Sequence, residues 1–260
     1  MLNKIITFLL LLAFAFALKA SELDDLLADL SIQEAPKKLS AEKFRLRAPK
    51  ITQPPEGAEE VTETYPNGTP LLHGFVKKDK KVGYWHLFYP NSQLKAEGEM
   101  RDDQRYGLWI YYAQNGKRSS DGEFNEKGQA VGEWRRYHPD GSLSGSGAYI
   151  NGKEEGLWTR YDTNGCLVAT TYYKAGRMEG PCYMYAPDGS VISKGGYTKG
   201  ERSGTWELHD PENGSAMKGE MKGGARIGVW TMKDSKNKKI ITFRYNDKGL
   251  LQNAVTNDWE

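Results

Sequence analysis

Few of the residues that usually carry chemistry lie together in this sequence. The acidic residues are spread along the chain, so no pair stands out as a general acid and base. A phosphate-binding Gly-Lys-Ser/Thr sequence is absent. The histidines are far apart, and none is paired at the spacing of a metal site. They are His73, His86, His138 and His209. These observations predict no catalytic residue, no metal site and no cofactor, and therefore a protein that is not an enzyme.

The two cysteines raise the question of a disulfide, which an oxidising compartment would favour. Cys166 follows a predicted turn, whereas Cys182 begins the next predicted strand. In a regular hairpin array they would be several residues out of register, which is too far apart for a disulfide bond. We therefore expect Cys166 and Cys182 to remain unbridged.

The composition indicates a chain with many turns and a thin sheet. Hydrophobic residues make up 38% of the 260 residues, while glycine, tyrosine and tryptophan number 29, 15 and 7. So little aliphatic material argues against a TIM barrel, a Rossmann enzyme or a polytopic membrane protein. The net charge of +2 comes from Lys4 and Lys19, because the remaining chain has equal numbers of basic and acidic residues. A neutral chain has no net attraction for nucleic acid, which we exclude as a partner.

One tripeptide, Gly-x-Trp, recurs along the sequence at a nearly constant period. Successive glycines are 24 or 25 residues apart, and Gly180 with Cys182 fills the one gap in the tryptophan series. The structural positions of this repeat are Gly83, Trp85, Gly107, Trp109, Gly132, Trp134, Gly156, Trp158, Gly180, Gly204, Trp206, Gly228 and Trp230. Such a period marks a series of similar supersecondary units.

Turn-forming pairs recur with the same period and define the unit. Asn-Gly and Asp-Gly favour hairpin turns because both residues tolerate positive φ. Around Trp134, residues 134–137 are a predicted strand, 139–141 a turn and 142–149 the return strand. We therefore predict an all-β fold, an elongated single-layer antiparallel meander of about seven 24-residue β-hairpin repeats with about fourteen strands. Each Trp is expected to pack on the equivalent Trp one repeat away and on a nearby Tyr or Phe, with glycines admitting the rings.

The first twenty residues have the pattern of a signal peptide. Lys4 precedes an uncharged apolar stretch, and small residues place the expected cleavage after Ala17 or Ala20. Export would bring the protein to the periplasm, the outer envelope or the outside of the cell.

The rest of the chain divides by composition into three parts. Residues 21–60 are predicted to be a flexible linker with a short amphipathic helix, because leucines at helical spacing precede several prolines. Residues 61–250 are the expected repeat domain, and residues 251–260 the expected C-terminal tail.

The pattern Tyr-x-x-Asn/Asp-Gly, followed by Gly-x-Tyr/Phe and x-x-Gly-x-x-x-Gly-x-Trp, resembles the MORN repeat from about Thr62 to Asp247. It is most similar to a bacterial variant that occurs in antitoxin components of toxin–antitoxin systems. The resemblance implies a scaffold or adaptor, with lipid binding suggested for some members, and carries over no catalytic residue. Cys182 departs from the pattern, and a signal peptide conflicts with the cytoplasmic site of an antitoxin.

The sequence thus predicts an exported, non-enzymatic repeat scaffold that mediates protein–protein interaction in the bacterial envelope. The candidate interaction surface is a tyrosine row three residues after the tryptophan positions, formed by Tyr112, Tyr137, Tyr161 and Tyr185. One alternative is an envelope glycan- or lipid-binding module, because rows of Tyr can stack on sugar rings or cations. Another is an antitoxin-like toxin-neutralising protein. The partner is expected to be another protein of unknown identity, with cell-envelope glycan or lipid as the alternative.

Overall fold

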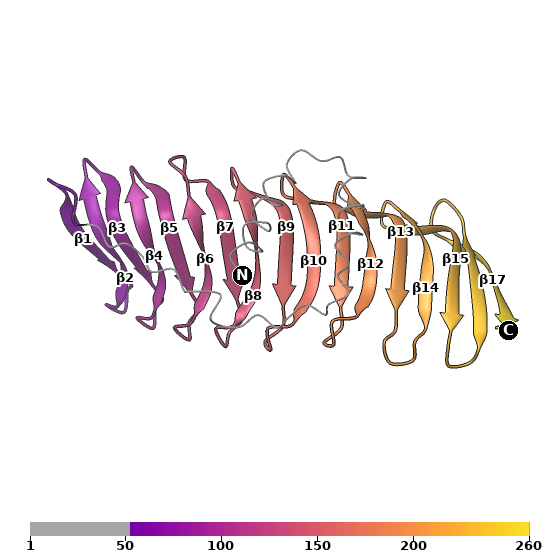
Figure 1. Cartoon of the computed structure of the whole chain (residues 1–260). Helices are drawn as coiled ribbons and strands as arrows, with labels where there is room; N and C mark the ends of the chain where they lie inside the picture. Colours follow the sequence, from indigo (N-terminus) through magenta and orange to yellow (C-terminus); the bar gives the residue numbers. More distant parts are fainter. Residues whose placement is uncertain (1–52, 260) are drawn as a thin grey trace, which may run out of the picture. The chain divides into compact units, whose positions relative to one another are not determined.

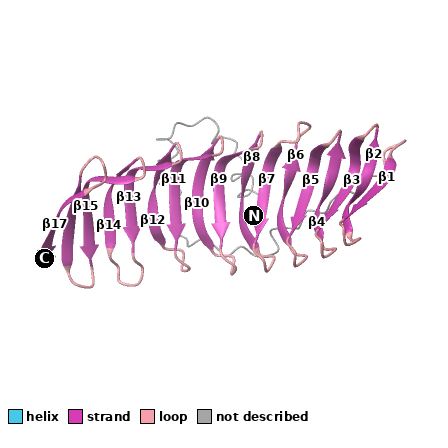
Figure 2. Ribbon diagram, turned by 180° about the vertical axis from the view of Figure 1, so that it is seen from behind, coloured by secondary structure: helices cyan, strands magenta, loops and turns pink. Residues whose placement is uncertain are grey.

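The computed structural model describes residues 53–259, which form one antiparallel sheet of 17 strands. The strands are β1 (Glu59–Thr64), β2 (Pro70–Lys77), β3 (Lys80–Phe88), β4 (Leu94–Arg101), β5 (Gln104–Tyr112), β6 (Arg118–Phe124), β7 (Ala130–Tyr137), β8 (Leu143–Ile150), β9 (Lys153–Tyr161), β10 (Leu167–Lys174), β11 (Arg177–Tyr185), β12 (Val191–Thr198), β13 (Glu201–His209), β14 (Ala216–Lys222), β15 (Ala225–Asp234), β16 (Lys239–Tyr245) and β17 (Leu251–Asp258). Figure 2 shows only strands and loops in this part of the chain. The predicted signal peptide and amphipathic helix lie outside the described residues.

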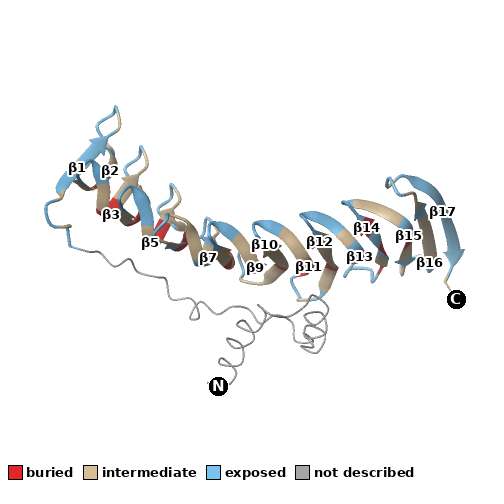
Figure 3. Cartoon of the chain, turned by 90° about the horizontal axis from the view of Figure 1, so that it is seen from above, coloured by how far each residue is buried: buried red, intermediate tan, exposed pale blue. Residues whose placement is uncertain are grey.

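Each strand from β2 to β16 pairs antiparallel with the strand before it and the strand after it in the sequence, while β1 pairs with β2 and β17 with β16. Figure 1 shows them side by side in chain order. The predicted single-layer hairpin meander is therefore confirmed. Buried residues lie mainly in the middle of the strands, and the turns are exposed (Figure 3).

Two kinds of turn alternate along most of the meander; residues 125–129 and 246–250 form longer turns where the alternation would give short ones. Short turns have two residues with positive φ, as at Asn151 (50°) and Gly152 (76°) between β8 and β9. This conformation matches the right-handed twist of the flanking strands. Several of the longer turns carry the Asn-Gly or Asp-Gly pair: Gly116 has φ of 76°, and its N–H donates to the carbonyl oxygen of Ala113 at 2.9 Å. The periodic turn signals thus determine where the chain reverses.

A tryptophan lying flat against a glycine is the packing element of every unit but one. We call the six tryptophans of the repeat, together with Cys182, the tryptophan column. A Cβ added to Gly98 would lie 2.5 Å from Cδ2 of Trp109, and one added to Gly147 would lie 2.2 Å from Cδ2 of Trp158. The same close approach joins Gly74 to Trp85, Gly122 to Trp134, Gly195 to Trp206 and Gly219 to Trp230. No residue with a side chain could occupy these glycine positions without moving the indole.

Successive tryptophans are separated by another aromatic ring, contrary to the expected direct packing of one indole on the next. Phe124 lies edge-on to both neighbours, with ring centroids 6.5 Å from Trp109 and 5.3 Å from Trp134. Tyr149 joins Trp134 to Trp158 in the same manner, at 5.5 and 5.4 Å. The prediction of direct indole-on-indole packing is therefore wrong here, because a Phe or Tyr from the intervening strand separates successive tryptophans. The expected packing on a nearby Tyr or Phe is confirmed.

The unit that lacks tryptophan also lacks its glycine. Cys182 is buried and pairs across the ladder with Thr171, which stands where the other units have the glycine. The Thr171 hydroxyl and the Cys182 sulfur are 3.5 Å apart. Both Cys166 and Cys182 are free thiols. Removal of the indole thus leaves room for a β-branched side chain at the matching position.

The sheet extends beyond the predicted repeat boundaries at both ends. Three further strands were missed: about fourteen were expected, and 17 are present. Residues 251–258, expected to be a tail, form β17, and β1 begins at Glu59, inside the expected linker. The turn at Asn246–Gly249 explains β17, since the Gly249 N–H donates to the Asn246 carbonyl at 2.9 Å and returns the chain along β16.

The contact of each tryptophan with a glycine of the preceding strand, which we call the Trp–Gly rule, predicts how Cys182→Trp will change the stability of the sheet. The new indole would overlap Thr171, so we expect unfolding free energy to fall by about 1–3 kcal/mol in urea melts. Thr171→Gly combined with Cys182→Trp should recover this loss, giving a coupling energy in a double-mutant cycle. Additive effects of the two changes would contradict the rule.

Candidate functional site

A second column of side chains lies on the same side of the sheet as the tryptophan column. It consists of the residues two positions after each column member, and we call it the flanking column: Leu87, Tyr111, Arg136, Arg160, Met184, Leu208 and Met232. The ring of Tyr111 lies 6.2 Å from that of Trp109 and 6.3 Å from that of Trp134. A flanking residue thus contacts the tryptophan of the next unit.

Cations cover the indoles from a fixed position. In several units a Lys or Arg four residues before the tryptophan lies over its ring, 4.7 to 5.0 Å from the centroid. The pairs are Lys81 with Trp85, Arg105 with Trp109, Arg202 with Trp206 and Arg226 with Trp230. Such contacts add cation–π attraction to the burial of the ring.

The unit of Trp158 arranges its cation differently. Glu154 stands four residues before Trp158, and the guanidinium over the ring comes from Arg136 of the preceding unit, at 4.7 Å. Arg136 donates to Glu154 Oε1 at 3.0 Å and to the Tyr149 hydroxyl at 3.1 Å. Arg136 therefore substitutes for the missing cation and is held by a carboxylate, a phenol and an indole.

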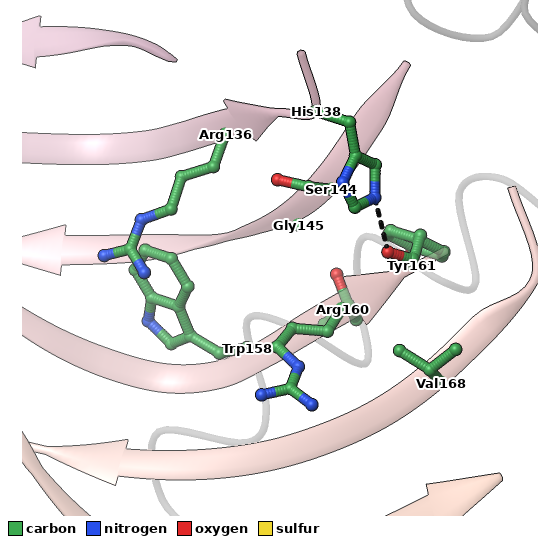
Figure 4. Close-up of a pocket in the computed structure, with 9 residues that line it drawn as sticks. Arg136, His138, Ser144, Gly145, Trp158, Arg160, Tyr161 and Val168 are labelled. Atoms are coloured by element: carbon green, nitrogen blue, oxygen red, sulfur yellow. Dashed lines mark hydrogen bonds between the residues drawn. The ribbon is translucent and has the colours of Figure 1, made fainter. Parts of the chain in front are cut away.

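Beside Arg136 the sheet carries a depression that we call the central hollow. It has a volume of about 470 Å³ and is lined by Arg136, His138, Ser144, Gly145, Trp158, Thr159, Arg160, Tyr161 and Val168 (Figure 4). Gly145 lies close to β9, since a Cβ there would be 2.6 Å from the Thr159 carbonyl oxygen. His138 Nε2 is 2.9 Å from the Tyr161 carbonyl oxygen, which fixes one wall. The lining contains two arginines and no carboxylate.

The predicted tyrosine row stands at the ends of β5, β7, β9 and β11, but most of its hydroxyls are already engaged. Tyr112 donates to Glu97 Oε1 at 2.6 Å and Tyr137 donates to Asp121 Oδ2 at 2.6 Å. Tyr185 is buried, and its hydroxyl is 3.5 Å from Thr170 Oγ1. Tyr161 lines the central hollow instead. Binding by this row remains a prediction.

Two carboxylates under the row were missed by sequence reasoning. Asp121 is fully buried, and its Oδ1 has no hydrogen-bond partner among the described residues. Glu97 is nearly buried and stands 24 residues before Asp121. Both carboxylates directly precede a glycine that contacts a tryptophan. That shared position is the signal that could have identified them.

Burial and these carboxylates change the ionisation of their neighbours. Burial, followed by the hydrogen bond and negative charge of Asp121, raises the pKa of Tyr137 to about 12. Burial and Glu97 likewise raise the pKa of Tyr112 to about 12. Burial lowers the pKa of His86, although Glu97 opposes this effect. The hydroxyls therefore act as hydrogen-bond donors throughout the physiological range.

Another carboxylate lies at the C-terminal end of the same face. Glu207 accepts from Lys194 at 2.9 Å and from Lys218 at 2.8 Å. These two hydrogen bonds lower the pKa of Glu207 to about 2. The arrangement resembles a structural ion-pair network rather than an acid–base pair.

Between residues 53 and 259, no three His, Cys, Asp or Glu side chains are grouped so as to hold a metal ion. The same residues include no helix with the length and apolar character needed to cross a bilayer.

The comparison with family models fits this geometry. Residues 130–151, which comprise β7, its turn and β8, match the model described as a MORN repeat variant. This segment is a MORN repeat. The other units share its period and, except at Cys182, its Trp–Gly contact, and most of them share its two kinds of turn. MORN repeats are generally non-enzymatic modules that bind proteins or membrane phospholipids. A search of curated proteins finds no match to the chain.

The buried Tyr137–Asp121 hydrogen bond gives a testable pH dependence. Because the folded pKa of Tyr137 is about 12 and that of an unfolded tyrosine is about 10, its contribution is complete below pH ~10 and is lost as the pH rises towards ~12. Tyr137→Phe should make the alkaline loss of stability shallower, and at neutral pH it should cost about 1–3 kcal/mol by leaving Asp121 without this donor.

Chemical denaturation between neutral and alkaline pH measures both effects. Tyr161→Phe is the matched control, because the Tyr161 hydroxyl makes no hydrogen bond to the described residues. An equal loss in the two variants would contradict this account of Tyr137.

Proposed function

We propose that the protein is an exported, non-enzymatic MORN-repeat scaffold that mediates protein–protein interaction in the bacterial envelope. The observation that carries this proposal is the contrast between a constant frame and a variable surface. The Trp–Gly contact repeats in six units, whereas the flanking column beside it changes from apolar to cationic and back to apolar. A repeated frame with varied side chains is how solenoid proteins present an extended binding surface.

The flanking column also favours a protein as the partner. Its central members, Arg136, Arg160 and Met184, are exposed, and Met184 is 37% exposed. Arg and Met are among the residue types enriched at protein–protein interfaces. The tyrosine row gives weaker support for a glycan- or lipid-binding module, since Tyr112, Tyr137 and Tyr185 have their hydroxyls directed to neighbouring strands.

The proposal of export has its own support in the first twenty residues, whose charge and apolar pattern match a cleavable signal. Fractionation of bacteria that make the full chain tests it. The exported form is expected to begin at Leu18 or Ser21, as read by N-terminal sequencing. A chain that keeps Met1 and stays in the cytoplasm would contradict export and favour the antitoxin-like alternative.

Capture of partners from envelope fractions tests the scaffold. Met184→Asp is expected to reduce capture of an envelope protein at least about tenfold, because it places a charge in an apolar contact of the flanking column. Leu157→Asp is the matched control, since Leu157 is 40% exposed and lies on the opposite side of the sheet. Equal capture by the Met184 variant and the unaltered protein would refute this surface.

A further inference from the structure

One row across three strands breaks the apolar pattern of the flanking column. Arg136 of β7 lies opposite Gly145 of β8, and Gly145 lies opposite Arg160 of β9. The corresponding row near the C-terminal end of the sheet is Leu208, Met217 and Met232. Two arginine residues therefore flank a bare glycine, with their Cα atoms roughly 10 Å apart across two strand spacings. This row forms the floor of the central hollow.

Contacts within the sheet explain the position of the Arg136 guanidinium, whereas Arg160 has neither an indole nor a carboxylate as a partner among the described residues. Arg136 covers the indole of Trp158 and is paired with Glu154. Arg160 repeats the position of Arg136 one unit later, where the next member of the tryptophan column is Cys182 and offers no ring. Within residues 53–259 no carboxylate pairs with Arg160, and its side chain is exposed. Arg160 is thus a cation without a carboxylate partner among the described residues, and the neighbour on which its charge acts is the phenol of Tyr173.

We propose that the central hollow binds an acidic side chain, Asp or Glu, of a protein partner, with Arg160 forming the ion pair. This inference rests on the proposed scaffold function and names the chemistry of the partner at the same surface. Arg136 contributes positive potential while remaining fixed by Trp158 and Glu154. The planar guanidinium of Arg160 offers the forked pair of donors that a carboxylate accepts.

The surroundings favour a carboxylate on a protein over an anionic membrane. The hollow is a single depression between β7 and β10, so it accepts one side chain rather than a plane of headgroups. Trp158 and Val168 supply apolar walls for the methylene groups of a glutamate. Apart from Lys4 and Lys19, the chain has balanced charges, so no long-range field draws it to an anionic bilayer.

Fluorescence anisotropy with the purified full chain and a fluorescein-labelled hexaglutamate peptide at low ionic strength tests the proposal. Arg160→Gln is expected to weaken binding at least about tenfold, which is the effect of losing one charge-assisted hydrogen-bonded pair. Arg160→Lys should give an intermediate loss, because lysine retains the charge without the fork. Arg177→Gln, which removes the same charge from an exposed residue of β11, should bind as the unaltered protein does.

Three results would overturn the proposal. They are the absence of peptide binding by the unaltered protein, an equal loss in the Arg177 variant, and Arg160-dependent binding to phosphatidylglycerol vesicles in place of the peptide. Thermal melts that match the unaltered protein verify that each variant is folded. Capture from envelope fractions separates this inference from the scaffold proposal. If the Arg160→Gln variant still captures the partner, only the proposed role of the central hollow is overturned. If the unaltered protein captures no partner, the scaffold proposal is overturned.

Discussion

The structure depends on the contact between an indole face and a glycine Cα on the preceding strand. A single-layer sheet has no second layer to cover its apolar side, so each large ring must lie flat against its own backbone. Only glycine permits this, since any Cβ would enter the ring, as at Gly98 and Trp109. The contact provides most of what this sheet has as a core: Trp85, Trp109 and Trp230 are among its most buried side chains.

This constraint explains which positions vary and which do not. Where the ring is lost, at Cys182, the glycine is replaced by Thr171 as well. Where the usual cation is replaced, at Glu154, Arg136 takes over from the neighbouring unit. Side chains beside the frame are free of such requirements, and there the sheet carries residues of different charge and size. An inert frame and a varied surface are what recognition of a partner requires, whereas catalysis requires a fixed constellation of groups.

The repeat period was sufficient to predict the all-β meander and most of its turns, but not which glycines admit the rings. The indoles lie against Gly98 and its equivalents, whereas the glycines of Gly-x-Trp, such as Gly107, have positive φ and would meet no atom within 4 Å if given a Cβ. The period could not reveal β17, because Leu251–Asp258 has no Trp or Gly mark and follows the array as a plain strand. Likewise, the role of Phe124 between two indoles follows from the sheet register, which a one-dimensional pattern does not give. The tyrosine row was placed correctly in sequence, but its hydrogen bonds to Glu97 and Asp121 join different strands. The sequence alone did not indicate Arg136 and Arg160 as a site, because each is an exposed charged residue of a common kind. Only the sheet register places them on either side of Gly145.

Every ladder in this sheet joins strands that are adjacent in the sequence, and this has a consequence for how the chain reaches its native state. The separation between paired residues never exceeds a hairpin's length, so contact order is low and little loop entropy is lost at each step. Folding can begin at any hairpin and extend towards either terminus, because a neighbouring hairpin supplies all the surface that the next one needs. A chain emerging gradually through a narrow pore could therefore acquire its structure progressively, without waiting for distant segments to arrive.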